Sequence, residues 1–143
     1  MPLRSDVSIE LMQQRARIGL PALLGLEVVG VADGDVQMRV SIEPRMLAPN
    51  GYLHAATVIA LADTACGFAC MAHLADGAEN FTTIELKTNF LGTATAGSLL
   101  ARARPVHLGR TTQVWDATVS HVESGRAIAV FRCTQLVLWP KAA

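Results

Sequence analysis

Asp63 is the residue whose surroundings most directly suggest chemistry. It is the only carboxylate between Leu53 and Leu74, where Ala, Leu, Ile, Val, Phe, Met and Cys fill most positions. A carboxylate withdrawn from water must find hydrogen-bond partners, shift its pKa or take part in a reaction. Partly desolvated, it could activate water as a general base or attack an electrophile itself. A purely structural Asp, accepting hydrogen bonds from a neighbouring loop, fits the same pattern.

Cysteine and histidine side chains share this stretch and are the candidate metal ligands. Cys66 and Cys70 lie close to His73, but their spacing matches no common zinc pattern. With Cys133 the cysteines are odd in number, and buried cysteine behaves as a small hydrophobe. We therefore predict no metal site, reduced thiols and a cytoplasmic location.

The stretch that carries Asp63 predicts a long buried helix over residues 53–74. It is rich in Ala and free of Pro, and a helix that is apolar nearly all round is a buried one. Its length would also suit a membrane span. However, a central Asp costs about 2.5–3.5 kcal/mol on insertion scales, and strongly basic flanks are missing. We therefore expect no membrane association, and residues 1–20 lack the apolar core of a signal peptide.

The remaining elements are predicted by periodicity and turn residues. A short amphipathic helix over about residues 6–19 starts near Asp6 or Ser8 and is ended by Gly19 and Pro21. Asp33-Gly34-Asp35 predicts the turn of a hairpin. A Pro- and Gly-containing loop over residues 43–52 precedes the long helix. The predicted strands cover residues 26–31, 36–42, 81–91, 98–108, 111–122 and 127–139.

Composition narrows the possible classes of protein. The 143 residues suit one domain, 1–143, with a core over about residues 26–139. Hydrophobic residues make up 51% and charged residues 17%, which excludes disorder and suggests apolar surface hidden in an oligomer. Lys and Arg together number 12, as do Asp and Glu, and no basic run occurs. Nucleic acid is therefore not an expected partner.

The order of elements predicts an α+β fold. Two strands precede the long helix and four follow it, so a curved antiparallel sheet must wrap around a long central helix. This arrangement resembles the hot-dog fold, and the similarity covers roughly residues 26–139.

A motif that ends at Asp63 sharpens this resemblance. Hot-dog acyl-CoA thioesterases of the phenylacetate-pathway (PaaI-like) branch carry G-x-x-H-G-G, then four residues, then L-A-D or L-A-E. Gly51, His54 and Asp63 match this pattern, as does Leu61-Ala62. The resemblance implies an acyl-CoA thioesterase in which Asp63 is catalytic and His54 lies near the thioester carbonyl. Coenzyme A would be part of the substrate, and no cofactor is expected.

Three positions depart from the family pattern. The two glycines are replaced by Ala55 and Ala56. Alanine keeps the backbone N–H that polarises the carbonyl in the family, so Ala55 is the expected donor, although the added methyl groups narrow the site. Many members carry Gln or Asn at the position of Ala48, and Asn50 is the nearest substitute.

The resemblance also implies a site shared between two subunits. We expect a homodimer, paired into a homotetramer, in which Thr82 and Thr83 meet Asp63 across the interface. Their other interpretation is ordinary strand threonine. Gly67, one helical turn beyond Asp63, would allow close approach of the acyl group or simply tight packing.

Coenzyme A carries phosphates, which require Arg or Lys near the mouth of the pocket. Arg110, in the turn before the fifth strand, is the first candidate, and Arg126 in the last hairpin is a weaker one. A solvated turn arginine is the alternative for both.

Two other functions remain open at this point. One is a hot-dog dehydratase or hydratase, which would need a histidine and carboxylate in a different local motif. The other is a non-catalytic acyl-CoA-binding protein, which the departures at Ala48, Ala55 and Ala56 keep possible. Fold alone does not decide among the three.

Overall fold

The computed structural model describes residues 1–141. Its helices are α1 (Ile9–Ala16), α2 (Gly19–Leu24), the 3-10 turn η1 (Pro44–Met46) and α3 (Ala55–Ala72). Its strands are β1 (Glu27–Ala32), β2 (Asp35–Ser41), β3 (Asn80–Phe90), β4 (Ser98–Leu108), β5 (Thr112–His121) and β6 (Ala127–Leu138).

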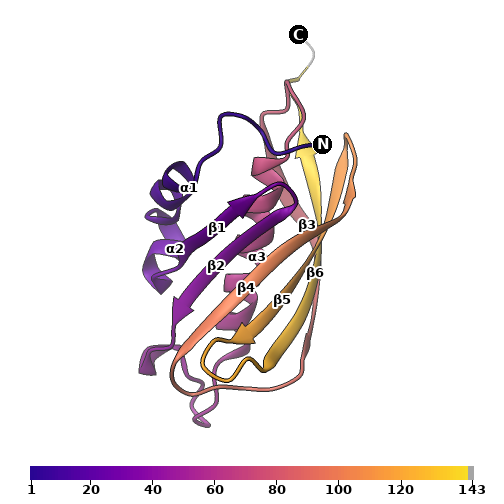
Figure 1. Ribbon diagram of the computed structural model, residues 1–143. Helices are drawn as coiled ribbons and strands as arrows, with labels where there is room; N and C mark the ends of the chain where they lie inside the picture. The colour runs from indigo at the N-terminus through magenta and orange to yellow at the C-terminus, as the bar shows by residue number, and fades with distance from the viewer. Residues whose placement is uncertain (142–143) are drawn as a thin grey trace.

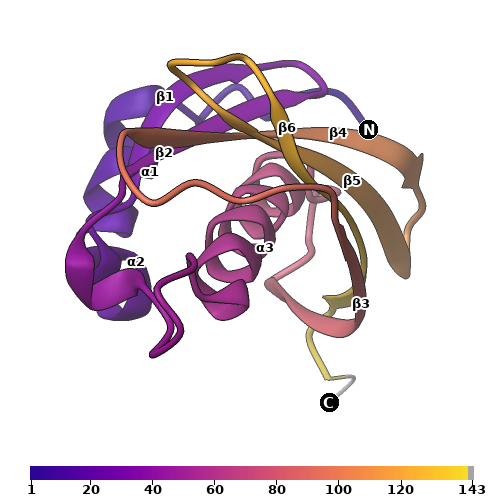
Figure 2. The same cartoon turned by 90° about the horizontal axis from the view of Figure 1, so that it is seen from below.

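The six strands form one antiparallel sheet in the order β1-β2-β4-β5-β6-β3. The sheet curves around α3, and Figure 2 shows the helix lying along its concave side. β3 crosses over to pair with β6 and becomes an outer strand of the sheet (Figure 1). The α+β architecture, with a curved antiparallel sheet wrapped around a long central helix, is therefore confirmed.

The core lies between the sheet and α3. Strand positions that alternate along β2, β4, β5 and β6 point inward, and they meet the buried side of the helix. Trp115, Met38 and Leu61 are among the largest fully buried side chains. By length and composition α3 could cross a membrane, with a mean hydropathy of 1.6 over 18 residues. In this fold, the same property makes it the core helix of a sheet.

The β1–β2 hairpin turns at Asp33 and Gly34, as predicted, and the turn is tied to the end of α3. Gly34 has a φ of +66°, which glycine adopts without strain. Its N–H donates to Nε2 of the buried His73 at 3.0 Å, while Nδ1 of that ring lies 2.8 Å from the carbonyl oxygen of Ala69. Both ring nitrogens of His73 are therefore engaged in joining elements of the fold.

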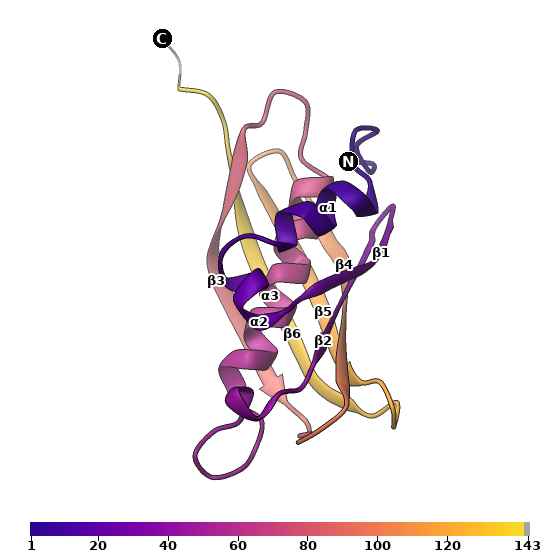
Figure 3. The ribbon, with the colours of Figure 1, turned by 90° about the vertical axis from the view of Figure 1, so that its left-hand side faces the viewer.

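The N-terminal helix differs from its prediction. Helix α1 starts after Ser8, whose hydroxyl accepts from the N–H of Leu11, but it ends at Ala16. Gly19 and Pro21, which we expected to end helical structure, lie at the start of the second short helix, α2. Gly19 reverses the chain with a φ of +66°, and proline is tolerated in the first turn of a helix. Figure 3 shows α1 and α2 lying along one flank of α3.

Candidate active site

Asp63 lies on the flank of α3 that is turned toward β3, the outer strand of the sheet. The side chain is partly buried, and this burial raises the pKa of Asp63 above its ordinary value. The hydroxyl of Thr83 donates to its Oδ1 at 3.4 Å, a contact that lowers the pKa by a smaller amount. The carboxylate is thus partly desolvated, and no cation among residues 1–141 pairs with it, which is a favourable state for a base or nucleophile.

Thr83 reaches Asp63 within one chain, and a contact with Asp63 of a second subunit stays a prediction. Strand β3 packs directly beside α3, and its alternate residues Phe81 and Thr83 point toward the helix. Thr82 lies between them, so its side chain is on the outer face of the sheet and exposed. Thr83 and Asp63 therefore belong together, whereas Thr82 is directed away from this carboxylate.

Gln135 is a polar neighbour of this site that sequence reasoning missed. The Thr83 hydroxyl oxygen also lies 2.9 Å from Oε1 of Gln135, which is its nearer acceptor, and Gln135 is fully buried. The strand pattern predicts that Gln135 points inward, because it lies an even number of residues along β6 from the buried Phe131, Cys133 and Val137. A glutamine in an inward-facing register must find buried partners.

The N-terminus of α3 carries the other half of the predicted chemistry. His54 is the N-cap, and its Nδ1 accepts from the N–H of Ala56 at 3.0 Å. Its carbonyl oxygen accepts from the N–H of Thr57 at 2.9 Å. The N–H of Ala55 has no acceptor among the described residues, so this exposed donor at the positive end of the helix dipole is available.

The loop residues before α3 are held in a compact turn. Asn50 Oδ1 accepts from the N–H of Tyr52 at 3.2 Å, and the N–H of Gly51 donates to the carbonyl oxygen of Ala48 at 2.8 Å. Gly51 has a φ of +85°, a conformation that explains why glycine stands there. The side-chain oxygen of Asn50 thus serves the turn.

Gly67 packs against an aromatic ring. A Cβ at this position would lie 3.1 Å from the ring of Phe81, closer than side chains normally approach. The absence of a side chain therefore lets β3 lie close to α3, next to the contact between Asp63 and Thr83. This favours the packing interpretation of Gly67.

Arg110 is exposed, as expected, but its guanidinium is not fully free. It stacks over the ring of Trp139 at 4.2 Å, while the indole N–H of Trp139 donates to the Arg110 carbonyl oxygen at 3.1 Å. The β5–β6 turn carrying Arg126 lies at the opposite end of the sheet (Figure 1). The stack holds the Arg110 guanidinium against the indole ring of Trp139.

The two halves of the predicted site lie far apart within one chain. Asp63 follows Ala55 by eight residues, which is about 12 Å along a helix at about 1.5 Å per residue. A thioester carbon attacked by the Asp63 side and a carbonyl oxygen held by the Ala55 N–H must be bonded to each other. One chain therefore cannot supply both groups to the same carbonyl.

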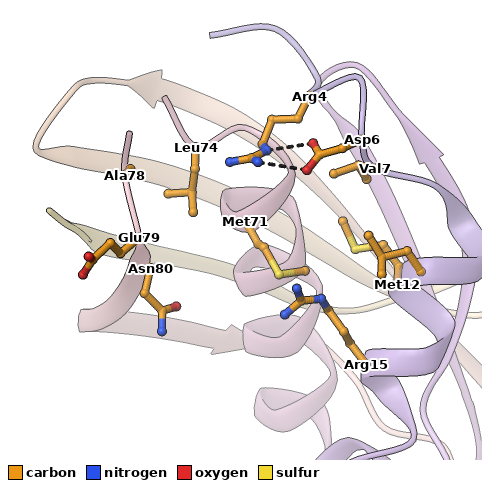
Figure 4. A pocket seen from close by; sticks show the side chains of 11 residues that line it. Arg4, Asp6, Val7, Met12, Arg15, Met71, Leu74, Ala78, Glu79 and Asn80 are labelled. Carbon is orange, nitrogen blue, oxygen red and sulfur yellow. Dashed lines mark hydrogen bonds and ion pairs between the residues drawn. The ribbon is translucent and has the colours of Figure 1, made fainter. Parts of the chain in front are cut away.

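Two hollows lie beside α3. One, of about 230 Å³, lies beside His54 and is mostly apolar, with Leu20, Leu24, Arg45, Met46, Leu47, Ala56, Thr57 and Ala60 completing its lining. The other, of about 260 Å³, lies at the far end of α3 beside Met71 and is bordered by Arg15 and by the ion pair of Arg4 with Asp6 (Figure 4). Of the predicted site residues, only His54 lines either hollow.

Comparison with known proteins identifies the family. A family model described as the thioesterase superfamily matches residues 50–133, which include the whole motif from Gly51 to Asp63. The chain belongs to the thioesterase superfamily. As a member of this superfamily it is a thioester hydrolase, and neither a dehydratase nor a purely binding role is favoured.

Individual members of the superfamily agree with the fold and the length of the chain. A 1,4-dihydroxy-2-naphthoyl-CoA hydrolase of Listeria monocytogenes is 29% identical over 117 residues, covering 82% of this chain and 94% of that protein. A mutant thioesterase from Pseudomonas aeruginosa has 26% identity and a TM-score of 0.88, covering 95% of this chain and 97% of its own. A thioesterase from Haemophilus influenzae has 26% identity and a TM-score of 0.89, with coverage of 96% and 95%. The thioesterase superfamily structures therefore share this hot-dog architecture over nearly the whole chain.

Proposed function

We propose that this thioesterase hydrolyses the thioester of a small acyl- or aryl-CoA to the free acid and coenzyme A. Asp63 acts as the general base or nucleophile, and the backbone N–H of Ala55 polarises the carbonyl. The observation that carries the proposal is the environment of Asp63, a partly desolvated carboxylate whose raised pKa is offset by no cation among the described residues. The PaaI-like motif supports the same assignment.

Each group has a defined task in thioester hydrolysis. Asp63 takes a proton from water as the water oxygen attacks the carbonyl carbon, or attacks that carbon itself to form a mixed anhydride, which water then hydrolyses to the free acid and the Asp63 carboxylate. The carbonyl oxygen gains negative charge, which the Ala55 N–H stabilises at the positive end of α3. Collapse of the tetrahedral species breaks the C–S bond and releases the coenzyme A thiolate. His54 shapes the entrance to this N–H by capping the helix.

The separation of Asp63 from Ala55 supports a site assembled from two chains. Because one helix holds the two groups about 12 Å apart, the Asp63 of one subunit would work with the Ala55 N–H of the other. Large apolar side chains that remain exposed on β3 and just beyond it, Ile84, Leu86, Phe90 and Leu91, supply surface for such an interface. We propose a homodimer, paired into a homotetramer.

Light scattering tests the shared site. We expect a dimer or larger assembly at micromolar concentration, with activity that falls on dissociation. Mixing an inactive Asp63→Asn chain with an inactive chain blocked at the helix start (Ala55→Pro, which removes the N–H) should restore part of the activity in mixed dimers. A stable, active monomer, or no restored activity on mixing, would contradict the shared site.

The substrate is proposed from the surface near His54. The hollow there presents mainly apolar side chains, which suit an apolar acyl or aryl group. The Listeria relative is named as acting on 1,4-dihydroxy-2-naphthoyl-CoA, and this compound is a reasonable member of a substrate panel. The nucleotide phosphates would meet Arg110, with Asn50 and Gly51 as further candidate contacts of the substrate. A cytoplasmic location and the absence of a separate cofactor complete the proposal.

A thiol-release assay over a panel of acyl-CoA substrates tests the function. The panel contains short aliphatic, benzoyl, phenylacetyl and 1,4-dihydroxy-2-naphthoyl thioesters, each with the wild-type chain and the Asp63→Asn variant. We expect hydrolysis of at least one aromatic or short acyl substrate that depends on Asp63. Equal rates for the two chains on the best substrate would show that another group carries the chemistry.

A further inference from the structure

We propose that Gln135 is a positioning residue whose amide, acting through the Thr83 hydroxyl, forms a hydrogen-bond relay that fits Asp63 both as a carboxylate and as a carboxylic acid. The inference rests on the proposed function, because it concerns the same carboxylate. It adds a residue that touches neither substrate nor reacting atoms and a reason for burying a glutamine beneath the site.

The relay spans three adjacent elements. Thr83 on β3 and Gln135 on β6 face each other directly in the strand register. The Thr83 hydroxyl oxygen lies 2.9 Å from Gln135 Oε1 and 3.4 Å from Asp63 Oδ1. Gln135 is fully buried, so its amide has no access to water and depends on these partners.

A single hydroxyl hydrogen cannot serve both acceptors at once. Thr83 has one O–H to donate and lone pairs with which to accept. In the arrangement observed, Gln135 Oε1 is the nearer acceptor, and Asp63 receives only a long contact. This arrangement suits a protonated Asp63, which can donate its own hydrogen to the Thr83 oxygen while Thr83 donates to Gln135.

A half-turn of the glutamine amide produces the opposite arrangement. The amide nitrogen then faces the Thr83 oxygen and donates to it, so that the Thr83 hydrogen is free for Asp63. An ionised carboxylate needs such a donor. Only the hydroxyl and the amide rotate, and no proton leaves Thr83 or Gln135. The proton that Asp63 gains in the reaction comes from the attacking water.

The far side of Gln135 accommodates both orientations. Its Nε2 now donates to the sulfur of Cys133 at 3.2 Å, and after the half-turn Oε1 would face the same thiol, which can donate its S–H. A thiol is one of the few buried groups that both donates and accepts weakly. Glutamine is also required, because a carboxylate or an alkyl chain at this position could not exchange roles.

The ionisable neighbours of Asp63 do not replace the relay. Cys66 on the same helix has a pKa raised well above its ordinary value by its hydrogen bond with Cys133 and by burial, so it stays neutral. Burial likewise raises the pKa of Cys70 to about 12. Charged residues on the neighbouring strands occupy outward-facing positions, namely Asp35, Arg39, Glu85, Lys87, Arg102, Arg104, Asp116 and Arg132. Helix α2 carries no charged residue.

The test follows the acid limb of the plot of log kcat/KM against pH, where activity falls as Asp63 is protonated. Thr83→Val removes the donor to the carboxylate and should raise the midpoint by about half to one pH unit. Gln135→Met keeps the side-chain volume but removes Oε1 of Gln135. Asp63 is then the one remaining acceptor for the Thr83 hydroxyl. This favours the ionised form, so the midpoint should fall by a similar amount.

Two controls separate the relay from general damage. Thr83→Ser keeps the hydroxyl and should restore the wild-type midpoint. Gln113→Met removes an equally buried glutamine on β5 that serves Trp115 and the His73 carbonyl oxygen, and it should leave the midpoint unchanged while lowering stability.

Opposite shifts for Thr83→Val and Gln135→Met support the relay. Unchanged midpoints, or shifts in the same direction, would overturn it. If Gln135→Met does not fold, a raised midpoint in Thr83→Val that Thr83→Ser restores still supports the relay, and an unchanged midpoint still overturns it. Failure of the proposed function would look different, since Asp63→Asn would then retain the wild-type rate.

Discussion

The two sides of α3 differ in burial and in the kind of residue they carry. The side toward the sheet holds fully buried apolar residues such as Leu61, Ala65 and Cys66. The less buried side, flanked by β3, holds the partly buried Asp63 and Thr64 and an exposed helix start at Ala55. Figure 2 shows the sheet curving over the first side, with α2 and β3 flanking the helix.

This difference teaches that one helix combines two kinds of role. A side chain on the covered side contributes to stability through packing density, and its loss leaves a cavity. A side chain on the less buried side contributes little to packing within the chain, which frees it for chemistry or for contact with another chain. Substitutions on the two sides should therefore separate stability from turnover.

The largest effect is expected on the covered side. Leu61→Ala should lower the free energy of unfolding by about 2–5 kcal/mol, because it removes a fully buried side chain and leaves a cavity. Urea unfolding followed by circular dichroism measures this loss. Turnover per folded molecule should remain close to wild type. A large fall in kcat at full folding would mean that the covered side also takes part in catalysis.

Asp63→Asn should show the reverse pattern on the less buried side. We expect kcat to fall by a factor of ~100 or more, as for the loss of a positioned base, while the fold is retained. Steady-state thiol release with the best substrate measures this change. Asp76→Asn, which alters an exposed carboxylate just beyond α3, is the matched control and should leave kcat unchanged.

A smaller effect is expected outside α3, at Arg110 in the turn between β4 and β5. Arg110→Ala should raise KM for acyl-CoA several-fold and leave kcat nearly unchanged, because an exposed contact with phosphate is modest and screened by salt. A truncated acyl-pantetheine, which lacks the nucleotide phosphates, should be almost unaffected. Arg126→Ala, in the turn at the other end of the sheet, is the control. Equal losses on both substrates would mean that Arg110 acts through its stack on Trp139.

The smallest effect concerns stability and pH. Because burial raises the pKa of Asp63 in the folded chain, its ionised form destabilises the fold above that pKa, and the penalty disappears below the unfolded pKa. Asp63→Asn should therefore be at least as stable as wild type at pH 7, and this advantage should shrink as the pH falls. Urea midpoints compared across pH measure it. An advantage that grows toward acid pH would contradict the sign.

Most of the fold followed from periodicity. The alternation along the strands and the long apolar run from Leu53 to Leu74 predicted the sheet and α3 to within a few residues. The order of strands was less accessible, because β3 pairs with the last strand and no local pattern encodes that choice. Helix α2 was missed since Gly19 and Pro21 end helices as readily as they begin them.

The candidate site was predicted in part. Asp63 stood out because a lone carboxylate in an apolar helix is costly to bury, and His54 occupies the predicted position at the helix start. The same-chain contact of Thr83 could not be foreseen without knowing that β3 lies beside α3. Gln135 escaped notice because a neutral amide in a strand carries no charge or motif to mark it.

The position of β3 at the sheet edge gives this strand a distinctive isotope-exchange pattern. It is bonded to β6 on one side, so in antiparallel geometry alternate N–H groups along its 11 residues point outward. Bonded amides should exchange with deuterium slowly and outward amides quickly, with the alternation shifting at the bulge between Thr83 and Glu85. Slow exchange at both sets would reveal a second strand laid along this edge, so one strand's amides report the packing of the assembly residue by residue.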